Sequence, residues 1–141
     1  MGKDQIIGGL PSCLAASVEG DIAIVRLARP EKRTALNDPL VDGIGSFLDA
    51  LPEQVRAIVL HGEGEHFCAG LDLSELTVRN TGEAMYHSRN WHRVFDKIEF
   101  GRVPVVAVLH GAVVGGGLEM AEACHVRVAE HSAYYALPEG V

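Results

Sequence analysis

The residues most suggestive of chemistry lie in HGAVVGGGLEMA, residues 110–121, where three glycines closely precede Glu119. Glycine loses more conformational freedom on folding than other residues, so a run of it indicates that bare backbone is needed. A glycine turn between a strand and a helix leaves N–H groups unpaired at the positive end of the helix dipole. Such a turn suits a phosphate or a developing oxyanion. Close packing of the helix on the strand explains the same spacing equally well.

Phosphate is the weaker interpretation, because neither common nucleotide pattern fits. Leu118 stands where a P-loop needs Lys followed by Ser or Thr, and Met120 stands where a dinucleotide fingerprint needs glycine. The helix sequence LEMAEAC is apolar on nearly every side, so we expect Glu119 to be buried, with Glu122 as the alternative. A helix-start carboxylate stabilised by the dipole also explains Glu119 without any function.

A second landmark is HFCAGLDL at residues 66–73. With RPEKRTALN at 29–37, HGAVVGGGLE at 110–119 and ALPE at 136–139, it resembles the crotonase superfamily (enoyl-CoA hydratase/isomerase). The four blocks occur in the family's order, with its approximate spacing, and the likeness covers about the N-terminal half of a family member. The resemblance implies chemistry on an acyl-CoA thioester, whose enolate-like oxygen is held by two backbone N–H groups.

Block by block, the resemblance places these donors on Leu71, a site that is often alanine in the family, and on Gly116. It places two catalytic carboxylates on Glu119 and Glu139. Adding water to a 2-enoyl thioester needs both carboxylates, one as general base toward water and one as acid toward Cα. Their presence favours a hydratase. The alternatives are another crotonase-type enzyme, such as a double-bond isomerase or thioester hydrolase, or a catalytically silent acyl-CoA-binding or scaffold protein.

The resemblance also implies a CoA-binding surface, with acyl-CoA as the substrate and no metal or redox cofactor. Arg33 could pair with a CoA phosphate, or be a solvated loop charge. Asp72 has two interpretations, a contact with CoA and a cap of the short turn in LDLSEL. The CoA-binding residues that we expect are Lys32, Arg33, Ala35, Leu36, Ala69 and Asp72.

Other chemically suggestive residues have simpler interpretations. His61 and His66 could belong to a metal loop, but no third ligand follows at zinc-like spacing, so a solvated loop is favoured. His87 and His92 are five residues apart and do not share a helix face. Cys68 has no base at a suggestive spacing, and we interpret it as a small packing residue.

Strands and helices alternate along the chain, which favours an α/β fold. Residues 1–13 resemble a flexible leader, and 14–141 one core domain. The resemblance implies a spiral of strand-strand-helix turns, apparently truncated because the family's C-terminal portion is absent. Asn37 or Asp38 is the expected cap of the first helix. Apolar runs predict strands over 14–18, 22–28, 57–60, 105–109, 126–129 and 133–137, and periodicity predicts helices over 39–51, 83–98 and 116–124.

Composition excludes several classes of protein. The 141 residues carry a net charge of −7, which argues against nucleic acid as a partner. Three widely spaced cysteines indicate neither a disulfide framework nor a zinc site. No apolar run reaches membrane-spanning length and no signal peptide is recognisable, so we expect no membrane partner and a cytoplasmic location. The resemblance further implies a homo-oligomer, a trimer or a dimer of trimers.

Overall fold

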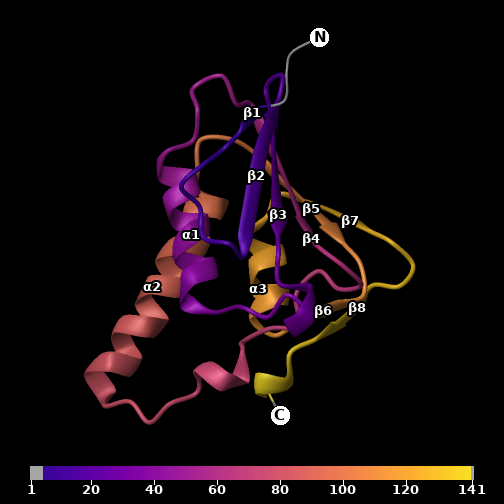
Figure 1. Cartoon of the computed structure of the whole chain (residues 1–141). Coiled ribbons are helices and arrows are strands. Elements are labelled where there is room, and N and C mark those ends of the chain that lie inside the picture. Colours follow the sequence, from indigo (N-terminus) through magenta and orange to yellow (C-terminus); the bar gives the residue numbers. More distant parts are fainter. Residues whose placement is uncertain (1–4, 141) are drawn as a thin grey trace.

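A computed structural model describes residues 5–140 and shows strands alternating with helices, as the sequence predicted (Figure 1). The main sheet has six strands in the order β1-β2-β3-β4-β5-β7. The first three strands pair antiparallel, whereas β3, β4, β5 and β7 run parallel. The strands are β1 (Gln5–Ile6), β2 (Leu14–Glu19), β3 (Ile22–Leu27), β4 (Ala57–Gly62), β5 (Val105–Leu109) and β7 (Val126–Ala129).

The three predicted helices are present as α1 (Asp38–Asp49), α2 (Thr81–Glu99) and α3 (Gly116–Ala123). Asn37 caps α1, because its side chain accepts a hydrogen bond from Leu40 N at 3.0 Å. Helices α1 and α2 pack together on the same side of the main sheet (Figure 1). The core between them and the sheet contains the apolar stripes predicted for both helices, with Leu40, Val41, Ile44, Phe47, Val94 and Ile98 buried.

A second sheet joins β6 (Ala112–Val114) in parallel to β8 (Tyr134–Ala136). Strand β6 was not predicted as a separate strand, because three residues between two glycines give no recognisable alternation. The isolated bridge from Cys68 to Val113 extends this sheet toward the loop 67–72. Strand β5, strand β6 and helix α3 therefore form one strand-strand-helix turn, which confirms the fold that the resemblance implied.

Part of the segment expected as a flexible leader belongs to the main sheet. Strand β1 pairs antiparallel with β2, and Ile7 N donates to Ala16 O at 2.9 Å. Three short 3-10 turns complete the described part: Pro30–Lys32, Leu73–Glu75 and Pro138–Gly140. Residues 1–4 and 141 lie outside it.

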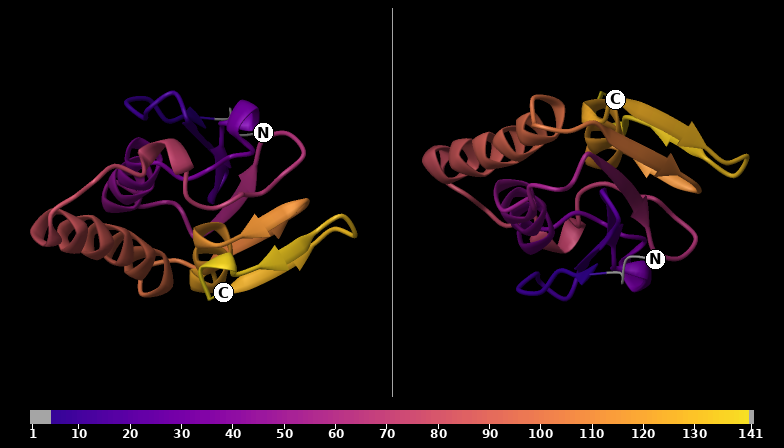
Figure 2. Two further views of the ribbon diagram at one scale, coloured as in Figure 1. Left: turned by 90° about the horizontal axis from the view of Figure 1, so that it is seen from below. Right: turned by 90° about the horizontal axis from the view of Figure 1, so that it is seen from above.

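The two C-terminal strands are much more exposed than the others. All residues of β7 and β8 are exposed, whereas inward-facing residues alternate with others along β2 and β4. Strands β7 and β8 lie on the side of the molecule away from α2 (Figure 2). Their exposed apolar side chains, with the residue that follows β8, are Val126, Val128, Tyr134, Tyr135 and Leu137.

Candidate active site

The loop 67–72 runs beside β6 and is fixed there by backbone hydrogen bonds. Cys68 N donates to Ala112 O at 2.9 Å, and Val114 N donates back to Cys68 O at 3.0 Å. Because the loop follows β4 and β6 follows β5, these bonds bring together two segments that lie far apart in sequence. The end of the loop therefore lies near the start of α3.

Within residues 5–140, neither of the two expected N–H donors has a backbone acceptor outside the helices and strands. Leu36 N donates to Gly70 O at 2.7 Å, and Asp72 N donates to Leu36 O at 2.8 Å. Between these bonds, the N–H of Leu71 donates to no protein acceptor within residues 5–140. Gly116 is the first residue of α3, where a helix offers its N–H no internal acceptor. Both groups are thus available to an oxygen atom from a ligand.

The three consecutive glycines are needed for three different reasons. Gly115 has a φ of 54°, in the left-handed region, and a side chain there would collide with the Glu139 carboxylate. Gly117 packs on Cys68, whose carbonyl oxygen would lie 2.5 Å from an added Cβ. Gly116 is buried, lines a cavity together with Leu71, and carries one of the two expected donor N–H groups. The sequence left two explanations of the glycine run open, close packing and access to a backbone N–H. Both explanations therefore apply.

Leu71 and Gly116 line one cavity of about 630 Å³ together with Glu119 and Glu139. Both glutamates are exposed, so the prediction that Glu119 is buried was wrong, and the alternative Glu122 is exposed as well. Apolar neighbours suggested burial, but only one side of the short helix α3 packs on the core. Its glutamates are on the side that borders the cavity.

The carboxylates lie next to the donor glycine. Glu119 Oε2 is 3.9 Å from the position that a Cβ on Gly116 would occupy. Glu139 follows β8 in the turn Pro138–Gly140, and its carboxylate lies against Gly115. Two carboxylates and two N–H donors, from the loop 67–72, helix α3 and the turn Pro138–Gly140, therefore border one space, as the resemblance implied.

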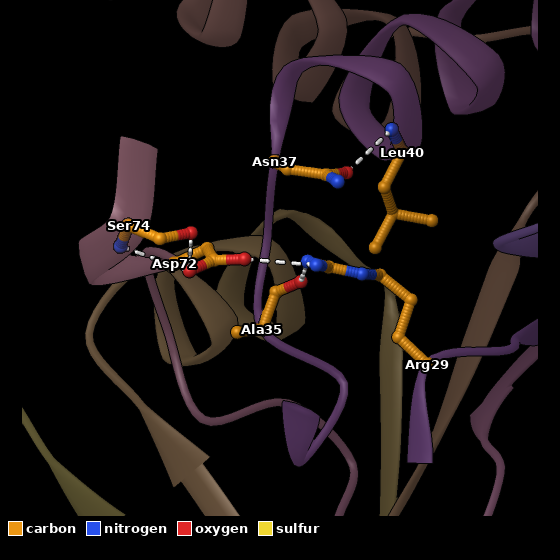
Figure 3. A network of polar contacts seen from close by, with 6 residues as sticks. All are labelled: Arg29, Ala35, Asn37, Leu40, Asp72 and Ser74. Carbon is orange, nitrogen blue, oxygen red and sulfur yellow. Dashed lines mark hydrogen bonds and ion pairs between the residues drawn. The ribbon is translucent and has the colours of Figure 1, made fainter. Parts of the chain in front are cut away.

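Arg29 joins the two loops of the site through contacts that no sequence pattern predicted. Its Nη1 donates to Ala35 O at 2.5 Å, and its Nη2 donates to Asp72 Oδ2 at 2.8 Å (Figure 3). The two side chains are only 12% and 9% exposed. A single guanidinium thus fixes the loop before α1 against the loop that carries Leu71.

Asp72 is committed to this network. Its Oδ1 accepts hydrogen bonds from Ser74 N at 3.0 Å and from Ser74 Oγ at 2.6 Å. Hydrogen bonds from Ser74, and next from Arg29, hold the pKa of Asp72 well below its usual range. Both carboxylate oxygens are engaged within the chain, so the geometry favours the local cap over the CoA contact that we expected for Asp72.

The remaining residues expected at CoA separate into two groups. Lys32 and Arg33 are exposed, and Ala69 is half-buried, so all three are open to a ligand. Ala35 is buried, and Leu36 has no exposed surface. The side chain of Leu36 cannot meet the CoA nucleotide and packs beside the donor glycine instead, which corrects our expectation for that residue.

The other candidates have structural roles or remain on the surface. Burial raises the pKa of the Cys68 thiol to about 12, so Cys68 is a packing residue rather than a nucleophile. His66 Nδ1 accepts a hydrogen bond from Ala112 N at 3.0 Å. Among residues 5–140, no three His, Cys, Asp or Glu side chains form a group that could hold a metal ion. No helix in the same part of the chain combines the length and apolarity needed to cross a bilayer.

The family model described as enoyl-CoA hydratase/isomerase matches residues 17–140. The chain belongs to this family. A relative from Bacillus subtilis (strain 168), named probable enoyl-CoA hydratase, is 33% identical over 131 residues, which cover 91% of this chain and 50% of the relative. The chain spans about half the length of such relatives.

Solved structures of similar proteins agree with this assignment. A candidate enoyl-CoA hydratase from Rhodopseudomonas palustris has a TM-score of 0.90 and 55% identity, over 95% of this chain and 53% of its own. A Thermobifida fusca family member, solved in complex with acetoacetyl-CoA, has a TM-score of 0.79 and 23% identity, over 88% of this chain and 53% of its own. The second comparison shows a shared fold.

Proposed function

We propose that the protein is an enoyl-CoA hydratase that adds water reversibly to a 2-enoyl-CoA thioester. The observation that carries this proposal is the shared cavity of Leu71, Gly116, Glu119 and Glu139, in which two N–H donors and two carboxylates meet. The hydratase names of relatives support the reaction type. The acetoacetyl-CoA complex of a protein with the same fold supports the substrate class.

In the proposed reaction, the thioester oxygen accepts hydrogen bonds from the N–H groups of Leu71 and Gly116. One glutamate takes a proton from water as the water oxygen forms a bond to Cβ, and the π electrons move toward the thioester oxygen as an enolate. The other glutamate gives a proton to Cα, and the carbonyl forms again. Preorganised donors of this kind stabilise the enolate by about 3 to 4 kcal/mol each.

The hydratase assignment is tested by incubating the complete polypeptide with 2-butenoyl-CoA. We expect the absorbance of the conjugated thioester to fall, and the product to gain the mass of one water molecule. Migration of the double bond with no gain in mass would instead identify an isomerase. Acyl-CoA binding of equal strength in wild type and Glu119→Gln, with no turnover in either, would identify the silent acyl-CoA-binding alternative.

We propose that the exposed strands β7 and β8 are covered in the working protein, by further polypeptide or by a neighbouring subunit. Exposed apolar area of this kind favours association or aggregation. Light scattering on the complete polypeptide tests the homo-oligomer, for which we expect a trimer or a dimer of trimers in the cytoplasm. Residues 1–141 alone should give a broad melt or aggregate, and a soluble monomer with a sharp transition would contradict this expectation.

A further inference from the structure

Helix α2 contributes Trp91, the only tryptophan in the sequence, to the cavity that Leu71 and Gly116 line. Trp91 is half-buried and packs against the hydrophobic core. Its ring lies between two other aromatic rings of α2, with a centroid separation of 5.0 Å to His87 and 6.5 Å to Phe95. These two contacts restrict the movement of the indole in the direction of the α2 axis.

Asp38 holds the indole from a different helix. The indole Nε1 donates to Asp38 Oδ1 at 3.0 Å, and His87 Nε2 lies 2.9 Å from the same oxygen. Asp38 is the first residue of α1, where the helix dipole stabilises its negative charge. Because the indole N–H can only donate, this carboxylate fixes the rotation of the Trp91 side chain.

The fixed ring lies close to the donor glycine. Trp91 Cζ3 is 3.5 Å from the position that a Cβ on Gly116 would occupy, and Leu36 Cδ1 is 3.1 Å from the same position. A thioester oxygen bound to Gly116 N–H places the acyl Cα only two covalent bonds away from that oxygen. A substituent on Cα that points toward this position would meet the benzo edge of Trp91.

We propose that Trp91 is a specificity-determining residue that excludes acyl groups branched at Cα, and that Asp38 is its positioning residue. This inference rests on the proposed function, because it takes the N–H of Gly116 as a donor to the thioester oxygen. The ligands accepted are acyl-CoA thioesters unbranched at Cα. A 2-methyl group meets the indole edge, which cannot turn aside while Asp38 accepts its N–H.

The test compares the binding of butanoyl-CoA and 2-methylbutanoyl-CoA to the complete polypeptide by calorimetry. Both thioesters lack the conjugated double bond, so their binding is measured whether or not the protein is a hydratase. We expect wild type to prefer the unbranched thioester by about tenfold or more, the usual value of one methyl group in a tight pocket. Trp91→Leu should bring this ratio close to one, and Trp91→Phe should lower it partly.

Asp38 and His92 provide matched comparisons. Asp38→Asn keeps an oxygen acceptor and should retain the wild-type ratio, whereas Asp38→Ala should lower it. His92→Leu removes another ring that borders the same cavity and should leave the ratio unchanged. The same ratio measured as kcat/KM, with 2-butenoyl-CoA and 2-methyl-2-butenoyl-CoA, should follow the binding ratio. Circular dichroism melts identify any variant that fails to fold.

Several outcomes would overturn the inference. These are an unchanged ratio in both Trp91 variants, an equal shift in His92→Leu, or the same loss in Asp38→Asn as in Asp38→Ala. A binding ratio that shifts as expected in a protein with no hydratase turnover supports the role of Trp91 and refutes the proposed reaction. The two proposals therefore fail separately.

Discussion

The two halves of the proposed site are built very differently. The donor half is closed by bonds within the chain: Leu36 is hydrogen-bonded to Gly70 and to the residue after Leu71, and Arg29 joins the two loops. The acid–base half is open, with Glu119 and Glu139 exposed on the cavity. The donors are therefore fixed by the described chain itself, whereas the environment of the carboxylates depends on whatever else borders the cavity.

The largest expected effect comes from filling the donor half. Gly116→Val should abolish detectable turnover, because its Cβ would lie 3.1 Å from Leu36 Cδ1 and its methyl groups would block the approach to the N–H. The measurement is kcat with 2-butenoyl-CoA. Gly8→Val is the control, because no atom lies within 4 Å of a Cβ at Gly8. Wild-type turnover in Gly116→Val would exclude that N–H as a donor.

Substitutions in the acid–base half should lower kcat severely, but less than Gly116→Val does. Glu119→Gln and Glu139→Gln should each lower kcat by about 10²–10⁴, the usual contribution of one acid–base group. Both variants should still bind acyl-CoA, since the donors are untouched. Glu122→Gln, one turn along α3 on the same cavity, should change kcat little. A near-wild-type rate in either of the first two variants would remove that glutamate from the mechanism.

Weakening the contacts that fix the donor half, without adding a side chain that blocks its N–H groups, should have an effect of intermediate size. Arg29→Gln removes the charge that joins Ala35 O to Asp72, so the Leu71 donor should be misplaced and kcat/KM should fall roughly ten- to a hundredfold. Arg29→Lys keeps the charge but loses the two-pronged geometry, so it should lie between wild type and Arg29→Gln. The donor loop does not depend on Arg29 if kcat/KM stays at the wild-type value in Arg29→Gln.

The contrast between the halves also explains what the sequence could predict. Local patterns predicted all three helices and most strands, because apolar periodicity and the Asn37 cap act over a few residues. The four blocks placed Leu71, Gly116, Glu119 and Glu139 together, and these four residues line one cavity. The ion pair of Arg29 with Asp72 was missed because its partners are 43 residues apart and neither residue type marks such a contact.

Glu119 illustrates the opposite error. Its apolar neighbours correctly indicated that α3 packs on the core, since Met120 and Ala121 are buried. They could not indicate which side of an eight-residue helix faces a cavity, because that depends on where Leu71 and α2 lie. Burial inferred from composition is therefore least dependable for short helices beside a site.

The smallest expected effect is on the stability of the fold at low pH, through Asp72 in the donor half. The pKa of Asp72 is lowered in the folded protein by hydrogen bonds from Ser74 and Arg29, so the unfolded chain binds a proton more readily at this position. The carboxylate therefore stabilises the fold at pH values above its ordinary pKa of about 4, and this stabilisation is lost as the pH falls below that value.

Asp72→Asn should isolate this contribution, because asparagine keeps the cap but removes the charge opposite Arg29. The variant should be less stable than wild type near pH 7, since Arg29 then lacks its ionic partner in a nearly buried position. The difference should shrink as the pH falls below about 4, where Asp72 of the unfolded wild-type chain begins to be protonated. Urea unfolding of both proteins across this range measures the difference. A gap that stays constant with pH would show that the Asp72 charge does not hold the two loops together, and the donor half would then depend on its backbone hydrogen bonds alone.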